Sequence, residues 1–506
     1  MTTQIEVTAA QAVAALKPNP APPCAVVVFG ATGDLTRRKL LPALYNLQVS
    51  GALPEHFVTL GVARRPLTDE QFRTDMRAAC DEFSRRKPDA ATWEGFAGRI
   101  DYVAADFSDP AGFERLSMRL QQLDFQHGLE GNRLFYLATP PSEFEVILRG
   151  LRSHGLLLPP GGEGPWSRVI IEKPFGRDLA SARALNTLVS EVLDESQTFR
   201  IDHYLGKETV QNILVMRFAN SIFEPLWNRK YVAAVEISAL ETVGVGTRGA
   251  FYDQYGVMRD VVQNHLLELV ALTAMEPPTS GSADDVRSEK LKVLNALRDG
   301  WDDTVSRDVV LGQYDGYRAE KDVAPDSFTP TYAALRLFVD NWRWQGVPFY
   351  LRAGKKLAKR ATEISVHLQP IPLSLFGRHD VCESVPPNVL TIRVQPDEGV
   401  QLQFASKIPG EDTRVGRVLM DMRYQEAFGG EPPEAYERLL LDAMRGDATL
   451  FSRRDWVETS WSWIDPLLQY FDRHPPTDFP NYAPASWGPK RADEWIARDR
   501  RAWRCD

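Results

Sequence analysis

Cysteine and histidine are scarce in this sequence, whose 506 residues include four cysteines and eight histidines. Cys24, Cys80, Cys382 and Cys505 are scattered, without the paired spacing of a zinc site, and they are too few for a disulfide framework in so long a chain. We interpret them as structural or incidental thiols, with a redox switch as the alternative. No group of His, Cys and Asp has metal-ligand spacing, so we expect no metal.

A positive charge excess and long apolar runs are also missing. The 68 acidic residues outnumber the 59 lysines and arginines, and the net charge of −9 argues against a nucleic-acid-binding protein. No apolar run is long enough to span a bilayer, and the N-terminus lacks a basic segment followed by an apolar one. We therefore expect a cytoplasmic protein with no nucleic-acid or membrane partner, which binds any anionic ligand through a local cluster.

The chain does have enough apolar material for large cores. Its residues are 43% hydrophobic and 25% charged, which predicts two or three globular domains. Residues 1–23 are interpreted as an N-terminal arm that ends in a proline-rich linker. The continuous apolar run at residues 24–29 is typical of a strand buried on both faces of a parallel sheet.

A glycine turn, residues 30–35 (GATGDL), follows that strand and leads into an amphipathic segment at residues 36–47. Strand, glycine turn and helix is the arrangement that lets backbone N–H groups approach a dinucleotide pyrophosphate. The turn lacks the third glycine of the full fingerprint, so the prediction depends on the surrounding strands.

Two of those strands point to the coenzyme. The strand at residues 57–62 ends at Arg64 and Arg65, where an NAD-binding fold places an acid that holds the ribose 2′-hydroxyl. Arginines there favour NADP, because a guanidinium binds a 2′-phosphate through paired hydrogen bonds; the alternative is that they only solubilise a loop. A strand at residues 102–105 ends at Asp106 and Phe107, where an adenine or ribose could rest.

Lys173 lies just beyond another predicted strand, residues 169–171, which follows one at residues 134–138. Ligands of open α/β sheets bind outside the carboxyl ends of the strands, so Lys173 could reach coenzyme and substrate together. Pro174 restricts Lys173 to an extended backbone. The alternative is an ordinary solvated lysine.

Residues 200–208 (RIDHYLGKE) combine an acid, an imidazole, a phenol and an ammonium group directly before an apolar-periodic run. The run predicts a helix that starts near Gly206, and the free N–H groups of a helix start attract an anion. His203, Tyr204 and Lys207 could surround one phosphate, whereas Asp202 would repel it and is assigned to orienting a histidine. The alternative is a set of surface charges that cap a helix.

Beyond this stretch apolar residues alternate with polar or small ones, which indicates strands with one solvent-exposed face. Such strands predict a largely antiparallel sheet with helices against its other face. The fold class is therefore α/β + α+β: a Rossmann-like coenzyme domain at residues 24–201 and a β+α domain at residues 202–506, with the first residues of the second domain in the cleft between them. The alternating segments are residues 235–239, 364–368, 390–394, 400–404 and 418–424.

Residues 256–267 open a helix that contains His265. Asp202 is a plausible partner, because a carboxylate on one ring nitrogen fixes the tautomer and leaves the other nitrogen free as a general base. Asp260 precedes His265 by five residues, about 140° around an ideal helix, so the two share no face unless the first turn is irregular or the helix end meets the cleft. A core histidine is the alternative.

A basic loop at residues 351–360 stands directly before a strand. Lys355 and Arg360 could be outer clamps for a phosphate. The alternative is a solvated basic face.

Several of these segments resemble the signature segments of the glucose-6-phosphate dehydrogenase family, in the family's order and spacing. They are residues 30–35, 172–176 (EKPFG), 200–208 and 259–265, and the nine-residue match at 200–208 is highly specific. The resemblance runs from about Cys24 to the end of the chain, including residues 132–141, 309–314 and 487–489.

The resemblance implies a Rossmann-like coenzyme domain followed by a β+α domain whose large antiparallel sheet forms a homodimer or homotetramer. It implies a small-molecule partner, glucose 6-phosphate, and a coenzyme, NADP. The implied reaction oxidises glucose 6-phosphate at C1 to 6-phospho-D-glucono-1,5-lactone, the first step of the oxidative pentose phosphate pathway.

The resemblance also implies roles for individual residues. His265 would be the general base at the C1 hydroxyl, Asp202 would orient it, and Lys173 would contact substrate and coenzyme. The implied phosphate ligands are His203, Tyr204, Lys207 and Arg360, and the implied ligands of sugar hydroxyls are Glu241, Asp260 and Lys355. The implied coenzyme ligands are Arg64 at the 2′-phosphate and Gly30, Thr32, Gly33, Asp34 and Leu35 in the pyrophosphate turn.

Two departures from the family's pattern matter. Thr36 replaces the usual alanine after the glycine turn, which should be tolerated but could change coenzyme affinity. The chain ends at residues 501–506 without the longer tail that completes a second, structural NADP site in animal members. We therefore expect one NADP per subunit, which equilibrium dialysis would test.

Two other functions are weighed against this one. An NADP-dependent oxidoreductase for an unphosphorylated sugar should lack the anion cluster formed by His203, Tyr204 and Lys207. A non-catalytic NADP-binding or regulatory protein could dispense with the base or its orienting acid, yet Asp202 and His265 are both present.

Overall fold

The computed structural model describes residues 21–161, 164–301, 304–373, 387–410, 414–429 and 433–505. Cys382 and all but the last three residues of the predicted N-terminal arm lie outside the described residues. The other cysteines are free thiols, of which Cys24 and Cys80 are buried and Cys505 is exposed. None of the described helices combines the length and apolar composition needed to cross a bilayer.

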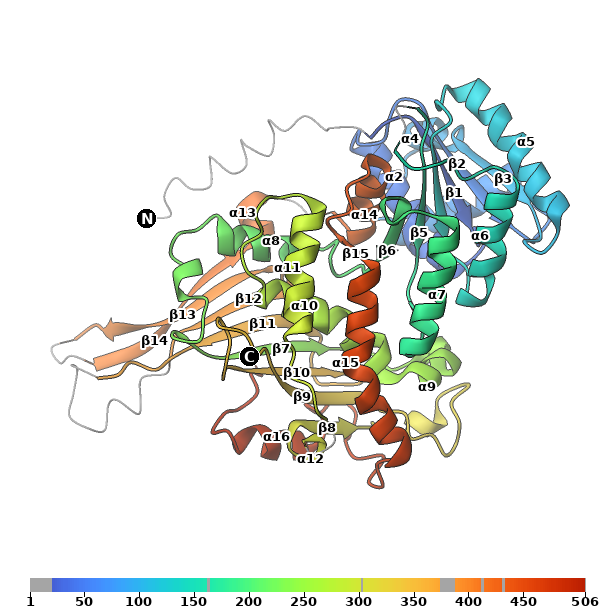
Figure 1. The fold of residues 1–506 in the computed structure, drawn as a ribbon. Helices are drawn as coiled ribbons and strands as arrows, with labels where there is room; N and C mark the ends of the chain where they lie inside the picture. Colours follow the sequence, from blue (N-terminus) through green and yellow to red (C-terminus); the bar gives the residue numbers. More distant parts are fainter. Residues whose placement is uncertain are drawn as a thin grey trace.

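A mainly parallel sheet forms the N-terminal part of the protein (Figure 1). Its described strands lie in the order β15-β6-β5-β4-β1-β2-β3, and every pair is parallel except β15 with β6. The order β3-β2-β1-β4-β5-β6 is that of doubly wound dinucleotide-binding sheets, so the Rossmann-like prediction is confirmed. The strands are β1 (Cys24–Phe29), β2 (Phe57–Ala63), β3 (Ile100–Ala104), β4 (Arg133–Leu137), β5 (Ser167–Ile171), β6 (Thr198–Ile201) and β15 (Phe451–Ser452).

Helices cover both faces of this sheet, because alternate strand residues point to opposite sides. Val26 and Val28 of β1 belong to the apolar cluster with residues of α2, α3 and α14, whereas Val27 and Phe29 belong to the cluster with residues of α5, α6 and α7. The helices are η1 (Thr36–Leu40), α2 (Leu41–Val49), α3 (Asp69–Phe83), α4 (Ala90–Ala97), α5 (Pro110–His127), α6 (Phe144–Ser153), α7 (Leu179–Val192) and, from later in the chain, α14 (Ala435–Arg445).

A second, larger sheet has its described strands in the order β14-β13-β12-β11-β7-β10-β9-β8. All neighbouring pairs are antiparallel except β7 with β10, which confirms the predicted antiparallel sheet and adds one parallel pair within it. The strands are β7 (Val232–Leu240), β8 (Val309–Gly312), β9 (Tyr332–Phe338), β10 (Pro348–Gly354), β11 (Ala361–Leu368), β12 (Val389–Gln395), β13 (Gly399–Ile408) and β14 (Arg414–Arg423).

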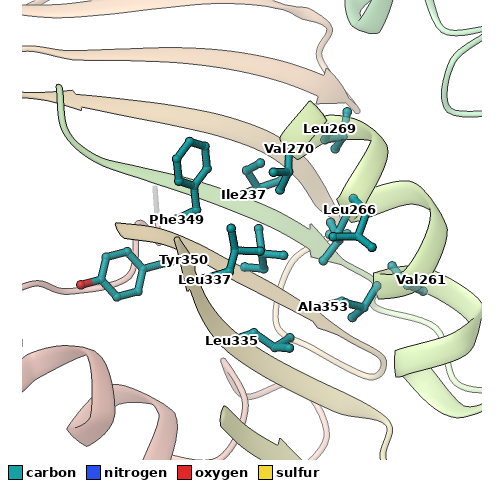
Figure 2. Packing of buried hydrophobic residues seen from close by; sticks show 14 of the residues in the cluster. Ile237, Val261, Leu266, Leu269, Val270, Leu335, Leu337, Phe349, Tyr350 and Ala353 are labelled. Atoms are coloured by element: carbon teal, nitrogen blue, oxygen red, sulfur yellow. The ribbon is translucent and has the colours of Figure 1, made fainter. Parts of the chain in front are cut away.

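The helix pair that carries His265 lies over the middle of this sheet (Figure 2). Leu266 and Val270 from η6 and α10 lie over Ile237 of β7 and Phe349 of β10, all fully buried, whereas Tyr350 points away from these helices. Burying one such side chain contributes about 1.5–3 kcal/mol, so this packing holds the histidine-bearing helix in place. The helices of this part are α8 (Glu208–Phe218), α9 (Gly249–Val257), η6 (Met258–Leu266), α10 (Leu267–Ala274), α11 (Ala283–Asn295), α12 (Val305–Asp308), α13 (Tyr424–Phe428), α15 (Arg454–Arg473) and α16 (Lys490–Ala497).

Two local predictions were wrong. Residues 351–354 are the end of β10 rather than part of a loop, because pairing with β7 on one side and β9 on the other outweighs their basic composition. Helical structure begins at Gly249, before the expected start at residue 256, and Gly256 interrupts it with a positive φ of 58°.

The chain returns to the first sheet after completing the second. α14 packs against α2, and β15 pairs with β6 through Ser452 and Arg200. α15 then packs against both α7 and α11. Residues from the range 202–506 thus contribute to the first sheet, and the division of the chain at residue 201 stays a prediction.

Candidate active site

Two adjacent parallel strands, β5 and β6, position the first site residues. Ile171 pairs with Arg200, so the carboxyl ends of both strands meet at one edge of the sheet. Lys173 lies two residues beyond β5, and Asp202 comes directly after β6. The structure thereby brings together two residues that are far apart in the sequence.

Asp202 and His265 form a buried, hydrogen-bonded pair. His265 Nδ1 donates to Asp202 Oδ1 at 2.6 Å, and the backbone N–H of Tyr204 donates to the same oxygen at 2.9 Å. Burial alone would raise the pKa of Asp202, but the charge that His265 carries when protonated and the hydrogen bonds from His265 and the Tyr204 backbone outweigh burial, so the pKa lies below its ordinary value. Asp202 is therefore an ionised acceptor at neutral pH.

His265 is arranged as a neutral base. Burial lowers its pKa below the ordinary value of 6.5, although the Asp202 carboxylate partly opposes this effect. The proton on Nδ1 faces Asp202, which leaves a lone pair on Nε2. Lys173 Nζ donates to that lone pair at 2.9 Å. A sugar hydroxyl that approached Nε2 would take the place of this ammonium group.

A π-helix explains the position of Asp260. The segment η6 is π-helical, and because its hydrogen bonds run from residue i to i+5, residues five apart lie about one turn apart on the same face. Lys173 Nζ accordingly lies 3.2 Å from Asp260 Oδ1 and 2.9 Å from His265 Nε2. Of the two alternatives raised for this pair, the irregular helix is the one observed.

Aromatic rings surround the His265 side chain. The Tyr204 ring stacks on the His265 ring with centroids 4.1 Å apart, and the His203 ring meets it edge-on at 4.6 Å. Burial, the charge that His265 carries when protonated and the charge of Lys173 lower the pKa of His203. His203 is therefore neutral at neutral pH and can serve as a hydrogen-bond donor to an anion.

Lys207 places a cation beside these rings, and Arg360 is a second cation whose charge acts on Lys207. Lys207 Nζ lies 4.0 Å from the centre of the Tyr204 ring and donates to Gln395 Oε1. Burial and then the Arg360 charge lower the pKa of Lys207 to about 8. Lys207 also precedes the first residue of α8, whose first turn is capped by no side chain among the described residues. A bound dianion would relieve the repulsion between the two cations and satisfy the helix start.

The parallel pair β7 and β10 brings a second polar group to the site. Glu241 directly follows β7 and Lys355 directly follows β10, and Lys355 Nζ lies 2.7 Å from Glu241 Oε2. Burial would raise the pKa of Asp260, but the charges of Lys173, Arg248 and Lys355 outweigh it and lower the pKa. Glu241, Asp260 and Lys355 together offer the mixed donors and acceptors that sugar hydroxyls need.

The glycine turn after β1 is shaped to bring backbone close to a ligand. Gly30 has a φ of 83°, and a Cβ there would lie 2.5 Å from the carbonyl oxygen of Ala138, so glycine is required. Thr36 is buried and its hydroxyl donates to the Gly30 carbonyl at 3.2 Å, so the threonine that departs from the family's pattern closes the turn. Further along the turn Thr32, Gly33 and Leu35 are half-buried and Asp34 is exposed.

The ends of β2 and β3 lie next to this turn. Arg64 and Arg65 are exposed after β2. Hydrogen bonds from Ser108, together with the Arg64 charge, lower the pKa of Asp106. Phe107 is 7% exposed and packs against Phe29 at 5.5 Å, so its part in coenzyme binding stays a prediction. The glycine turn and the exposed arginines fit a dinucleotide with an additional phosphate.

Three residues at the site carry no local signal in the sequence. Arg248 lies 3.9 Å from Asp260, Gln395 of β12 binds Lys207, and the Tyr436 ring from α14 lies parallel to the His203 ring with centroids 6.4 Å apart. Gln395 and Tyr436 reach the site from distant segments, whereas Arg248 lies 12 residues before Asp260. Tertiary contacts alone identify them.

One group of side chains has spacing that a metal ion could use. Asp202, His203 and His265 each bring a candidate ligand atom within 4.8 Å of the others. The Asp202–His265 hydrogen bond already occupies one atom of each residue, and the Lys173 ammonium group lies 2.9 Å from His265 Nε2. A nearby positive charge disfavours a cation, so this geometry suits a base and its orienting acid better.

Two family models match the chain. "Glucose-6-phosphate dehydrogenase, NAD binding domain" matches residues 27–212, and "Glucose-6-phosphate dehydrogenase, C-terminal domain" matches residues 214–504. Together they cover most of the sequence and follow the same order as the two sheets. The first also indicates a coenzyme of the nicotinamide dinucleotide class.

Relatives and solved structures agree with the family models. The chain is 48% identical over 500 residues to glucose-6-phosphate 1-dehydrogenase of Chlamydia pneumoniae, and the match covers 96% of this chain and 97% of that protein. It is 40% identical over 498 residues to glucose-6-phosphate 1-dehydrogenase of Bacillus subtilis (strain 168), and that match covers 96% of this chain and 99% of the relative. A solved glucose-6-phosphate dehydrogenase in complex with glucose 6-phosphate matches with a TM-score of 0.86 and 33% identity, covering 97% of this chain and all of that one. The Mycobacterium avium enzyme matches with a TM-score of 0.82 and 36% identity, covering 96% and 99%.

Proposed function

The chain belongs to the glucose-6-phosphate dehydrogenase family, and we propose that it oxidises glucose 6-phosphate at C1 to 6-phospho-D-glucono-1,5-lactone with NADP as the hydride acceptor. The observation that supports the proposal most directly is the buried Asp202–His265 pair, which lies beside the cationic Lys207 cluster where the two sheets meet. This is the first step of the oxidative pentose phosphate pathway.

The reaction removes a proton from the C1 hydroxyl and a hydride from C1. His265 Nε2 takes the proton, while the O–H electron pair forms the second C–O bond of the lactone and the C–H electron pair departs with the hydride. When bound, the nicotinamide ring supplies the hydride acceptor. Asp202 keeps the Nδ1 proton in place and stabilises the imidazolium that forms.

The proposed substrate site has one group of residues for the phosphate and another for the sugar hydroxyls. We infer that His203, Tyr204, Lys207 and Arg360 hold the phosphate, which is supported by the two close cations and the uncapped start of α8. Glu241, Asp260 and Lys355 would bind the sugar hydroxyls. Lys173, already within 3.2 Å of both Asp260 and His265, would lie between C1 and the coenzyme.

The preference for NADP is assigned to Arg64, with Arg65 beside it, because two exposed guanidinium groups at the end of β2 suit a 2′-phosphate. The turn formed by Gly30, Thr32, Gly33, Asp34 and Leu35 would hold the pyrophosphate. Asp106 and Phe107 are assigned to the adenosine half. We propose one NADP per subunit.

A homodimer or homotetramer is proposed through the second sheet. Exposed apolar side chains on β13 and β14 support this assignment, because a monomer would leave them in water. Sedimentation equilibrium would distinguish the two assemblies from a monomer. The residues are Ile408, Val418, Leu419 and Met420.

The proposal is tested by comparing glucose 6-phosphate with glucose at equal NADP. Because the anion cluster should bind only the phosphorylated sugar, we expect kcat/KM for glucose 6-phosphate to be larger by at least about 10³-fold, as for a site built around polar groups that are left unpaired by the wrong substrate. Equal kcat/KM values for the two sugars would favour the dehydrogenase of an unphosphorylated sugar instead.

A further inference from the structure

A small cavity of about 10 Å³ lies against the Asp202–His265 pair. Its lining comes from both parts of the chain, since it includes Ile201 of β6 as well as Trp456 and Val457 of α15. Among its lining residues are Lys173, Asp202, Gln263, Ser452 and Trp456. The cavity touches the carboxylate that orients the proposed base, so its contents bear on how that carboxylate is held.

Two buried polar atoms of the lining residues have no hydrogen-bond partner within the described parts of the chain: Asp202 Oδ2 and Trp456 Nε1. The two residues are 3% and 4% exposed. A carboxylate oxygen only accepts and an indole N–H only donates, so the two atoms are complementary. Both residues line the same cavity, so one molecule of about the size of the cavity can satisfy both atoms at once.

We propose that this cavity is a binding site for one ordered water molecule, which accepts a hydrogen bond from Trp456 Nε1 and donates one to Asp202 Oδ2. The cavity is at the lower limit of the roughly 10–15 Å³ that holds a single water, and a buried water needs two to four polar partners. Ser452 Oγ supplies a third, because it donates to Glu268 Oε1 at 3.0 Å and keeps a lone pair for the second O–H of the water.

Trp456 thereby becomes a positioning residue for the proposed reaction. Asp202 Oδ1 receives hydrogen bonds from His265 and from the Tyr204 backbone, whereas Oδ2 has no partner among the described residues. The χ2 angle, which rotates an aspartate carboxylate, has a broad distribution. A hydrogen bond to Oδ2 therefore narrows the range of carboxylate orientations in which Asp202 meets His265. The consequence falls on proton transfer rather than on substrate binding, and it rests on the function proposed above.

The test uses two matched tryptophan variants of the full-length protein. Trp456→Phe removes the N–H and keeps an aromatic ring near Lys290, which lies 5.8 Å from the Trp456 ring centre. Trp463→Phe is the control: Trp463 lies on the same helix, is also buried, and donates its N–H to the Arg298 carbonyl at 3.1 Å. The control thus loses a hydrogen bond that is unrelated to Asp202.

The single-turnover rate of NADPH formation at saturating glucose 6-phosphate and NADP is the first readout. For Trp456→Phe we expect a fall of about three- to tenfold, the size expected for one lost hydrogen bond, with KM for glucose 6-phosphate unchanged. Trp463→Phe should lower the melting temperature but keep the wild-type rate. An unchanged rate in Trp456→Phe, or an equal loss in both variants, would overturn the positioning role.

The second readout is a crystal structure of the wild-type protein. It requires no activity and tests the water site even if Trp456→Phe fails to fold. We expect electron density for one water within hydrogen-bond distance of both Trp456 Nε1 and Asp202 Oδ2. A cavity without density, or a water that bonds only one of these atoms, would overturn the proposal. A wild-type protein that holds the water but reduces no NADP would instead refute the proposed function.

Discussion

Replacing Asp202 with asparagine removes the charge that orients His265 while keeping the size of the side chain. Asp202 Oδ1 accepts hydrogen bonds from His265 Nδ1 at 2.6 Å and from the Tyr204 backbone at 2.9 Å. An amide that turns its NH₂ group toward Nδ1 favours the tautomer protonated on Nε2, in which the histidine cannot accept the C1 hydroxyl proton. An amide that turns its oxygen there keeps the tautomer but no longer stabilises the imidazolium.

The expected loss in kcat is about 10²–10⁴-fold, the contribution of a positioned general base. The KM for glucose 6-phosphate should change little. Of the proposed phosphate ligands, only Tyr204 hydrogen-bonds to the Asp202 side chain, and it does so through its backbone N–H. A loss in kcat without a change in KM indicates an interaction that operates in the transition state.

The same substitution should move the acid limb of the pH profile. The Asp202 carboxylate raises the pKa of His265 against the lowering effect of burial, so its removal lowers that pKa further. Because activity is lost as His265 gains a proton on acidification, the residual activity of Asp202→Asn should persist to lower pH than that of the wild type.

The assay is the steady-state rate of NADPH formation, with calorimetric binding of glucose 6-phosphate to confirm that the site is intact. Asp308→Asn is a matched control, because Asp308 is also buried but its ion pairs are with Arg307 and Arg336. A kcat for Asp202→Asn within about threefold of wild type, or a kcat for Asp308→Asn that falls as far, would refute the assigned role of the pair.

Four further predictions concern binding and pH. Lys207→Ala should raise KM for glucose 6-phosphate by about 10–100-fold with little change in kcat, because it removes one charge-assisted hydrogen bond to the phosphate. Initial-rate measurements test this, and a change confined to kcat would contradict the assignment of Lys207 to the phosphate. Since the pKa of Lys207 is lowered to about 8, the wild-type KM for glucose 6-phosphate should also rise as the pH passes that value. Arg64→Ala should weaken NADP and leave NAD nearly unaffected, measured as the ratio of kcat/KM values, and equal losses for both coenzymes would contradict its role at the 2′-phosphate. In the wild type, kcat/KM should be constant near neutral pH and fall on acidification with a midpoint below 6.5, because burial lowers the pKa of His265; a midpoint above 6.5 would show that the charge of Asp202 outweighs burial.

Features that depend on neighbouring residues could be predicted from the sequence. The buried strand at residues 24–29, the glycine turn after it and the strand ends near Arg64 and Lys173 are set by local patterns, and the structure has strands at these places. Lys173 and Asp202 meet because β5 and β6 are adjacent parallel strands, but the sequence analysis predicts no strand at residues 198–201, so this adjacency could not be predicted.

Features that depend on tertiary contacts could not be predicted. The π-helical path of η6, which brings Asp260 and His265 to one face, requires packing against the second sheet and has no periodicity of its own in nine residues. The parallel pairing of β7 with β10, which joins Glu241 to Lys355, could not be predicted, because residues 351–354 of β10 are interpreted from the sequence as a loop. Tyr436 likewise reaches His203 only because the chain returns to the first sheet through α14.

The measurement that bears most directly on the central claim is NADPH formation from glucose 6-phosphate by the wild type and by His265→Ala, with substrate affinity measured separately. The account predicts that the wild type turns over and that the variant binds glucose 6-phosphate yet loses about three or more orders of magnitude in kcat, the range for a removed base. A variant that retains wild-type kcat, or a wild type that binds NADP but reduces none with any hexose phosphate, would contradict it.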